Sequence, residues 1–293
     1  MKDVVIIGCG PAGLSTAMQL ERYGIKPLVI EKCSVGGLIR NANCIQNYPG
    51  FPDGIAGIEF VELLKNQAEL YNIDILFDEV NKLTFGQNKF MVSTSSCEIV
   101  SNIVVIASGT TPKKCEDITI SSTARKKIFY EIYPMRNFCN KHIGIIGAGD
   151  CAFDYSLTLA KSNYLYIFNR SDKVSCLPIL WEKVKQNENI RYFSNRKIIS
   201  LDSENNKLRA IFRRNNDNEN FIFDYIVFAI GRMPEIGFLD SSVITQQKRL
   251  IAENRLFFAG DVNNGIFRQI SIAVGDGVRT AMKIYQNLIG NGK

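Results

Sequence analysis

Short apolar runs, glycine-containing turns and helical patterns alternate along the chain. Residues 4–7 form the first apolar run, and a turn separates them from a helical pattern over residues 14–23. A second apolar run, residues 28–30, follows it. Strands that alternate with helices in this way are typical of βαβ units with parallel strands. The alternation begins again at residue 143, so the pattern predicts an α/β fold with two such units.

The first turn, Gly8-Cys9-Gly10-Pro11-Ala12-Gly13, has the spacing of a dinucleotide-binding loop. In such a loop Gly8 makes the tight turn, Gly10 lets the backbone approach a pyrophosphate, and Gly13 lets the helix pack closely on the strand. The phosphates would lie at the helix N-terminus. Glu31 stands 23 positions after Gly8, at the end of the second strand, where a carboxylate can accept hydrogen bonds from an adenosine ribose.

The motif recurs 139 positions later as Gly147-Ala148-Gly149-Asp150-Cys151-Ala152, again after an apolar strand. The next strand, residues 164–168, runs into Asn169 and Arg170. Arg170 has the same offset from Gly147 that Glu31 has from Gly8. A cation at this place favours an adenosine 2′-phosphate, and therefore NADPH over NADH. An arginine at a strand end can also be an ordinary surface residue, so both nucleotides stay open.

The C-terminal part of the chain carries a third group of candidate residues. Residues 257–259 form a buried strand that ends in Gly260-Asp261, from which a carboxylate can hold the sugar-alcohol chain of a flavin; a helix cap is the alternative. Arg268-Gln269 come before an amphipathic helical pattern over residues 270–285. The positive end of that helix would stabilise a reduced, anionic flavin ring.

Together these motifs resemble the pyridine-nucleotide-dependent flavoprotein reductases, most closely the small thioredoxin reductases. Further landmarks of the resemblance are Gly36-Gly37, Asn47-Tyr48-Pro49-Gly50-Phe51, Ala107-Ser108-Gly109, Phe228-Ala229-Ile230-Gly231-Arg232 and Phe257-Phe258-Ala259-Gly260-Asp261-Val262. The resemblance implies two Rossmann-like dinucleotide-binding domains, with the NAD(P)H-binding domain, residues 113–235, inserted into a discontinuous FAD-binding domain, residues 1–112 and 236–293. It also implies a homodimer and a rotation of the nucleotide domain during turnover.

The resemblance further implies two sets of binding residues. For FAD they are Gly8, Gly10, Pro11, Ala12, Gly13, Glu31, Lys32, Gly37, Leu38, Asn47, Gly109, Gly260, Asp261, Arg268, Gln269 and Ile270. For NADPH or NADH they are Gly147, Gly149, Asp150, Cys151, Asn169, Arg170 and Gly231. The chain departs from the family where a His-Arg-Arg triplet is replaced by Phe168-Asn169-Arg170, and where a later arginine is replaced by Lys173 or Val174.

The CxxC pair of the thioredoxin reductases is absent. In the family's register its cysteines fall on Tyr130 and Tyr133, and the aspartate that follows falls on Pro134. Disulfide reduction needs a thiolate, a second thiol that resolves the mixed disulfide, and an acid. Tyr130 and Tyr133 are the candidates at this catalytic position, where covering the flavin and plain packing are both open. We expect the only histidine, His142, at the start of a strand in a structural role.

The eight cysteines are never closer than eleven positions, so neither a zinc pair nor a thiol-exchange pair is expected. Cys9, Cys44 and Cys151 are the alternatives for thiol chemistry, and a packed thiol is the simpler interpretation of each.

The composition limits the classes of protein. A length of 293 residues with 46% hydrophobic and 22% charged residues suits about two globular domains. No apolar run approaches the roughly 20 residues of a membrane span, and no signal peptide is evident, so a cytoplasmic protein is expected. The net charge of +6 includes Lys113-Lys114, Arg125-Lys126-Lys127 and Arg213-Arg214. These groups form either a solvated face or a docking surface for an acidic protein; nucleic acid is not expected because aromatic residues do not interleave with the charges.

Three functions follow from these residues. The first is an FAD-dependent oxidoreductase that takes hydride from NAD(P)H and passes electrons from flavin to a non-disulfide acceptor: a ferredoxin- or flavodoxin-type carrier, a quinone, a flavin or oxygen. The second is a disulfide or thiol reductase that uses an unpaired cysteine. The third is a non-catalytic flavin-binding sensor or structural protein.

Overall fold

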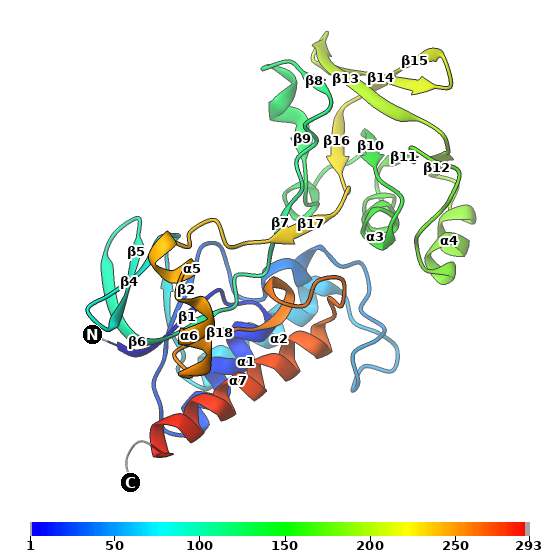
Figure 1. Ribbon diagram of the computed structural model, residues 1–293. Coiled ribbons are helices and arrows are strands. Elements are labelled where there is room, and N and C mark those ends of the chain that lie inside the picture. Colours follow the sequence, from blue (N-terminus) through cyan, green and yellow to red (C-terminus); the bar gives the residue numbers. More distant parts are fainter. Residues whose placement is uncertain (1, 291–293) are drawn as a thin grey trace. The chain divides into compact units, whose positions relative to one another are not determined.

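The computed structural model describes residues 2–290, which fall into two compact units (Figure 1). The first unit contains residues 2–40, 45–111 and 233–290, and the second contains residues 41–44 and 112–232. The second unit is therefore inserted into the first. Residues 41–44, which we expected in the first unit, group with the second because the Asn41 side chain accepts hydrogen bonds from two backbone amides of residues 132 and 133.

The first unit is built on a seven-stranded sheet, in which six strands have the order β3-β2-β1-β6-β5-β4 and the seventh, β18, also pairs with β6. Its strands are β1 (Lys2–Ile7), β2 (Leu28–Glu31), β3 (Asp74–Phe77), β4 (Val80–Gly86), β5 (Lys89–Thr94), β6 (Glu98–Ile106) and β18 (Leu256–Phe258). β1, β2, β3, β6 and β18 are parallel, whereas β5 is antiparallel to β6 and β4 is antiparallel to β5. Ile106 is in register with both Ile7 and Phe258, so three strands end together at one edge of the sheet.

One face of the parallel strands is covered by helices, and the other by the β4–β5 hairpin with α5 and α6. The helices are α1 (Pro11–Arg22), α2 (Gly57–Leu70), α5 (Ser241–Ile244), α6 (Gln247–Ala252) and α7 (Ile270–Gly290). Val4 and Ile6 pack with α1 and α7, whereas Val5 and Ile7 pack with the hairpin, α5 and α6. Because both faces of β1 are buried, this strand is apolar at every position over residues 4–7. Figure 1 shows α7 beside α1.

The second unit contains a five-stranded parallel sheet with the order β12-β11-β10-β16-β9. Its strands are β9 (Ile128–Phe129), β10 (His142–Ile146), β11 (Tyr164–Phe168), β12 (Ile190–Phe193) and β16 (Tyr225–Phe228), and its helices are α3 (Asp150–Leu159) and α4 (Pro178–Lys185). A second sheet consists of β8 (Thr119–Ile120), β13 (Lys197–Glu204), β14 (Lys207–Arg214) and β15 (Asp217–Phe223). Phe168, Phe212 and Phe223 belong to the buried cluster between the sheets.

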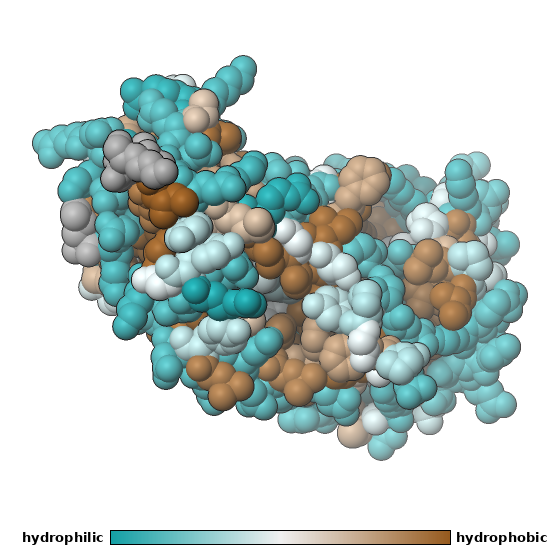
Figure 2. Space-filling model, turned by 90° about the horizontal axis from the view of Figure 1, so that it is seen from below, coloured by the Kyte–Doolittle hydropathy of each residue, from teal (hydrophilic) through white to brown (hydrophobic). Residues whose placement is uncertain are grey.

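Short elements complete the two units. The strands β7 (Thr110–Pro112) and β17 (Arg232–Pro234) pair where the chain passes between the units. The 3-10 helices are η1 (Gly37–Asn41), η2 (Ala124–Lys127), η3 (Tyr133–Met135) and η4 (Gly260–Val262). None of the helices within residues 2–290 is long and apolar enough to cross a membrane. Figure 2 shows one face of the molecule, on which apolar side chains lie in small groups among hydrophilic ones.

Candidate flavin and nucleotide sites

The first glycine loop joins β1 to α1 at the edge where the parallel strands end. Gly8 has a φ of +101°, and a Cβ atom there would lie 2.4 Å from the Ala107 oxygen. A Cβ atom on Gly13 would lie 1.9 Å from the Gly8 oxygen. A Cβ atom on Gly10 would meet nothing within 4 Å. Gly8 and Gly13 therefore have no room for a side chain, whereas the space beside Gly10 is open.

The Glu31 carboxylate, at the end of β2, ties this loop to the segment that follows the strand. Glu31 is 8% exposed, and its Oε2 accepts the Cys9 N–H at 2.8 Å. Its Oε1 accepts the Cys33 N–H at 2.8 Å and the Ser34 N–H at 3.2 Å. Oε2 accepts only one bond and has a further lone pair, so these bonds are compatible with a ribose contact at that oxygen. The sequence indicated the ribose role and not this structural one.

The candidate residues near the C-terminus lie against the N-terminus of α1. Gly260, with a φ of +78°, comes so close that its Cβ atom would lie 2.7 Å from the Ala12 Cβ. Asp276 Oδ2 accepts hydrogen bonds from the Gly260 N–H at 3.3 Å and from Asn264 Nδ2 at 2.6 Å. A Cβ atom on Gly277 would lie 2.3 Å from the Ala12 oxygen. Asp276 and Gly277, both in α7, were not among the residues predicted from the sequence, although small residues recur in α7.

Asn47 and Gln269 meet in the same unit, with Asn47 Nδ2 donating to Gln269 Oε1 at 2.8 Å. Gly37 also approaches the glycine loop, since a Cβ atom on it would lie 3.4 Å from the Gly10 Cα. The Glu235 N–H donates to the Gly109 oxygen at 3.1 Å.

The other residues predicted for FAD are placed as follows in the first unit. Lys32 is exposed, and its Nζ lies 3.9 Å from Glu79 Oε1. Leu38 lies in η1, Asp261 in η4, Arg268 directly before α7, and Ile270 at its first position.

This arrangement suits the pyrophosphate of FAD. α1 begins after Gly10 with Pro11 in its first turn, and no side chain among the described residues caps its N-terminus. Its first N–H groups and the positive end of the helix therefore remain for an anion, and Gly10 leaves space beside them. Gly10, Ala12, Gly13, Glu31 and Gly260 are the residues that would surround the phosphates and the ribose.

The second glycine loop repeats the geometry in the other unit. Gly147 has a φ of +130°, and a Cβ atom there would lie 2.3 Å from the Ala229 oxygen. Gly149 precedes α3, whose N-terminus receives no side-chain cap within residues 2–290. Asp150 Oδ1 accepts the Leu177 N–H at 2.7 Å. Gly231 has a φ of +108°, and its oxygen accepts the Lys113 N–H at 3.0 Å.

The strand β11 delivers Asn169 and Arg170 to the edge where this second loop lies. Phe168 is part of the buried aromatic cluster. Asn169 is 6% exposed, and its Nδ2 donates to the Lys173 oxygen and to Tyr192 Oη, both at 2.9 Å. Arg170 is exposed, and no carboxylate among the described residues pairs with it. Only the last residue of the altered triplet therefore presents its side chain to solvent.

The segment that replaces the CxxC pair is held by packing and backbone hydrogen bonds. Tyr130 stacks on Phe228 with ring centroids 5.8 Å apart, and burial raises the pKa of its hydroxyl. Ile132 is 2% exposed. Asn41 Oδ1 accepts the N–H groups of Ile132 at 3.1 Å and Tyr133 at 2.9 Å. Packing, one of the two roles left open for Tyr130, is thus observed; whether Tyr130 or Tyr133 also covers the flavin stays a prediction.

All eight cysteines in the described residues are free. Cys9 is fully buried, and desolvation, with a smaller contribution from Glu31, raises the pKa of its thiol to about 12. The Cys9 thiol therefore stays protonated and enclosed at neutral pH. Cys151 is exposed, yet desolvation by the atoms around its sulfur raises its pKa, so its place in the first turn of α3 does not produce a stable thiolate.

His142 begins β10, as expected, and its Nδ1 lies 2.8 Å from Tyr166 Oη.

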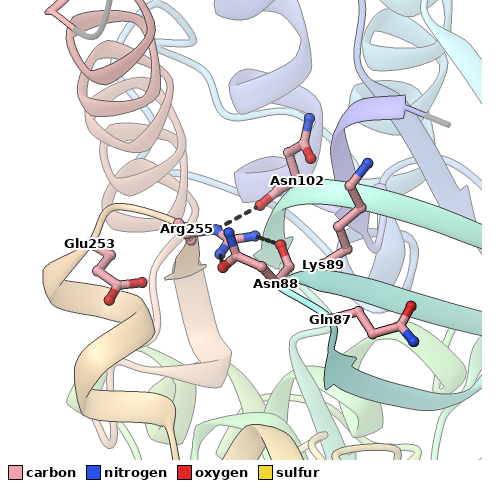
Figure 3. Close-up of a pocket in the computed structure, with 6 residues that line it drawn as sticks. All are labelled: Gln87, Asn88, Lys89, Asn102, Glu253 and Arg255. Atoms are coloured by element: carbon pink, nitrogen blue, oxygen red, sulfur yellow. Dashed lines mark hydrogen bonds between the residues drawn. The ribbon is translucent and has the colours of Figure 1, made fainter.

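A polar pocket lies in the first unit, lined by Gln87, Asn88, Lys89, Asn102, Glu253 and Arg255 (Figure 3). There Arg255 donates to the Asn88 oxygen at 2.6 Å and the Asn102 oxygen at 3.3 Å. Arg255 precedes β18, so this pocket is at the opposite edge of the parallel strands from the glycine loop.

Two glycine loops, each between a parallel strand and an uncapped helix, define a protein with two dinucleotide sites in one chain. Residues 2–277 match the pyridine nucleotide-disulphide oxidoreductase family. The chain belongs to this family. It is an FAD-dependent NAD(P)H oxidoreductase of the thioredoxin reductase-like type, and its fold consists of two Rossmann-like domains, one inserted into the other.

Individual relatives extend this finding. The thioredoxin reductase of Treponema pallidum is 28% identical over 290 residues, which cover 95% of this chain and 94% of that protein. The crystal structure of Lactococcus lactis thioredoxin reductase in the FR conformation has a TM-score of 0.87 at 25% identity, with 99% of this chain and 100% of that chain covered. The bacillithiol disulfide reductase Bdr of Staphylococcus aureus has a TM-score of 0.76 at 18% identity over 100% of this chain and 99% of its own, which shows a shared fold alone.

Proposed function

We propose that this chain oxidises NADPH, transfers the hydride to FAD, and passes the two electrons from flavin directly to an acceptor that is not a protein disulfide. The observation that carries the proposal is the segment at the family's cysteine positions. Tyr130 and Tyr133 stand there, and neither has a thiol that could accept electrons. Ile132 between them is buried, and Asn41 Oδ1 accepts the backbone N–H groups of Ile132 and Tyr133.

FAD supplies the two-electron redox chemistry when bound, and the residues of the first unit hold it. Gly10 and the first turn of α1 receive its pyrophosphate, Glu31 its ribose, and Asp261 its sugar-alcohol chain. The N-terminus of α7, after Arg268 and Gln269, stabilises negative charge on the ring. The remaining residues of the FAD set, Lys32, Leu38, Asn47, Gly109 and Ile270, line the same site in this proposal.

The nicotinamide nucleotide binds to the second unit in this proposal. Gly147 and Gly149 let its pyrophosphate approach the N-terminus of α3, with Asp150 and Cys151 in the first turn and Gly231 beside the loop. Arg170 provides the positive partner for a 2′-phosphate, which favours NADPH.

An acidic electron-carrier protein is the acceptor that the surface charge favours. Lys197 and Arg213 are paired directly across β13 and β14, and both are exposed. Like charges in such a pair repel, and neither has an ion-pair partner within residues 2–290. A carrier of the ferredoxin or flavodoxin type would relieve this repulsion.

We further propose that the protein acts in the cytoplasm as a homodimer.

An anaerobic titration tests the proposal. NADPH, added to the protein with FAD bound, should bleach the visible flavin band, and NADH should do so less effectively. A flavin that neither nucleotide reduces would contradict the proposal and favour a non-catalytic flavin-binding protein. Steady-state assays with ferredoxin, flavodoxin, quinone, free flavin, oxygen and disulfides as acceptors then identify the route by which electrons leave.

A disulfide reductase remains a second candidate because the matched relatives are thioredoxin reductases. Cys44, Cys139 and Cys151 are exposed, whereas Cys9 is enclosed. Disulfide reduction that disappears in a single Cys→Ser variant of one exposed position would establish this candidate. Unchanged turnover with all three variants would exclude those cysteines as carriers of the electrons.

A further inference from the structure

The turn after β11 is organised around one buried amide, that of Asn169. Both Nδ2 hydrogens are used, one for the Lys173 oxygen and one for Tyr192 Oη, each at 2.9 Å. Oδ1 accepts the Ser171 N–H at 3.2 Å. The side chain of Asn169 therefore closes residues 169–173 into a turn and leaves no amide hydrogen for a ligand.

The backbone of Asn169 fixes the same turn to the neighbouring strand and its extension. Its N–H donates to the Phe193 oxygen at 2.8 Å, and its oxygen accepts the Arg196 N–H, also at 2.8 Å. The Asn195 N–H donates to the Ser171 oxygen at 3.2 Å. The turn is thus attached to β11, to β12 and to the connection between β12 and β13.

The charged side chains of this turn are Arg170, Asp172 and Lys173, and all three are exposed. None of them forms an ion pair with another described residue. Arg196, a cation on the attached segment, is already paired with Glu219 at 3.0 Å. Arg170 and Lys173 are therefore the cations available at the end of β11, the place at which a Rossmann-type unit distinguishes an adenosine 2′-phosphate from a 2′-hydroxyl.

We infer that Asn169 is a positioning residue for nucleotide selectivity, because it presets the turn 169–173 so that Arg170 and Lys173 receive the 2′-phosphate of NADPH. The inference rests on the proposed function, in which the second unit binds NADPH. It assigns Asn169 an indirect role in place of the direct contact that the sequence suggested. Tyr192 shares this role because its hydroxyl receives one of the two amide hydrogens.

The chain provides a matched control at the other end of the same strand. Asn163 directly precedes β11 and is 4% exposed. Its Nδ2 donates to the oxygens of Phe138 and Leu159, and its Oδ1 accepts the Lys141 N–H. Asn163→Ala therefore removes three amide hydrogen bonds away from the turn, against four at the turn for Asn169→Ala, the fourth coming from Ser171 Oγ at 3.4 Å.

The test compares kcat/KM for NADPH with kcat/KM for NADH in the protein with FAD bound. We expect Asn169→Ala to lower the NADPH:NADH ratio by at least about fivefold, and Tyr192→Phe to lower it less. Asn163→Ala should leave the ratio unchanged. Arg170→Ala should lower the ratio in the wild-type background and have little further effect in Asn169→Ala, because the two residues act together. Additive effects, or an equal change in Asn163→Ala, would overturn the inference.

Calorimetric binding of 2′,5′-ADP separates this inference from the proposed function. Wild-type protein should bind 2′,5′-ADP more tightly than 5′-AMP, and Asn169→Ala should lose that difference while Asn163→Ala keeps it. This result stands even if neither nicotinamide nucleotide reduces the flavin, which would contradict the proposed function alone. If Asn169→Ala does not fold, the same comparison with Tyr192→Phe decides the question, and an unaltered preference there would sink the inference.

Discussion

Asn47 and Gln269, 222 positions apart in the sequence, are joined by a hydrogen bond of 2.8 Å from Asn47 Nδ2 to Gln269 Oε1. Asn47 belongs to the segment after the 3-10 helix η1, and Gln269 directly precedes α7. The bond links two parts of the first unit that are both assigned to FAD binding. It therefore couples the position of the helix N-terminus to the segment that contains Asn47.

We predict that Asn47→Ala and Gln269→Ala each weaken FAD binding, and that the double variant is no worse than about the poorer single one. A neutral hydrogen bond contributes about 0.5–1.5 kcal/mol, and this one can be lost only once. FAD dissociation constants from fluorescence titration provide the measurement. Asn81→Ala removes a comparable exposed bond to Ser95, 3.1 Å long, and should leave FAD affinity unchanged. Fully additive losses at Asn47 and Gln269 would contradict the coupling.

Glu31→Gln should lower both FAD retention and stability. A glutamine amide group can accept with only one oxygen, so it would turn an N–H group toward a backbone donor at Cys9 or at Cys33 and Ser34. Loss of bonds to a buried carboxylate costs about 1.5–3 kcal/mol each. The FAD content after gel filtration and the Tm measure the effect. Glu79→Gln disturbs only the exposed pair with Lys32 and should change stability by less than about 0.5 kcal/mol.

Much of the fold could be predicted because each unit repeats one local pattern. The helix expected over residues 14–23 is found at Pro11–Arg22, and the one expected over residues 270–285 is found at Ile270–Gly290. The strand expected over residues 257–259 occupies Leu256–Phe258. Apolar periodicity and glycine spacing are local signals, so they predict elements of this kind well.

The contacts within the sites depend on residues that are distant in the sequence, and these could not be predicted. Nothing near Asp276 in the chain indicates that its carboxylate accepts the Gly260 N–H, and nothing near Asn169 indicates that its amide donates to Tyr192 Oη. The resemblance implied a nucleotide contact for Asn169, which stays a prediction, and it gave no information on the rotamer that the side chain adopts. The grouping of residues 41–44 with the second unit likewise depends on long-range contacts of Asn41.

The Cys9 thiol should make stability depend on alkaline pH. Its pKa is raised to about 12 in the folded protein, while an unfolded cysteine titrates near about 8.5. Above that value the unfolded chain loses the proton first, so the folded state loses stability as the pH rises toward 12. Cys9→Ala lacks this penalty. Its unfolding free energy relative to wild type should improve by about 1–2 kcal/mol between pH 8 and pH 10, as denaturant titrations would reveal. A constant difference across this range would mean that Cys9 is not desolvated as described.

Two glycines of α7 should respond in opposite ways to alanine. At Gly277 a Cβ atom would lie 2.1 Å from Ser15 Oγ and 2.3 Å from the Ala12 oxygen, and the latter is backbone that cannot rotate away. Gly277→Ala must therefore push α7 away from α1, which costs about 1–3 kcal/mol and disturbs the first turn of α1, where the pyrophosphate is proposed to bind. At Gly275 a Cβ atom would meet nothing within 4 Å, so Gly275→Ala should stabilise the helix by up to about 1 kcal/mol.

Thermal unfolding and FAD titration of the two glycine variants test this contact directly. Gly277→Ala should lower the Tm and weaken FAD binding together, since one displacement causes both, whereas Gly275→Ala should raise the Tm slightly and leave FAD binding intact. A Gly277→Ala protein with wild-type stability and affinity would show that the two helices are not in the close contact that the Thr16 hydroxyl, 3.2 Å from the Gly277 oxygen, indicates. A loss of FAD without a loss of stability would mean that α7 acts on the flavin site by a route other than its packing against α1.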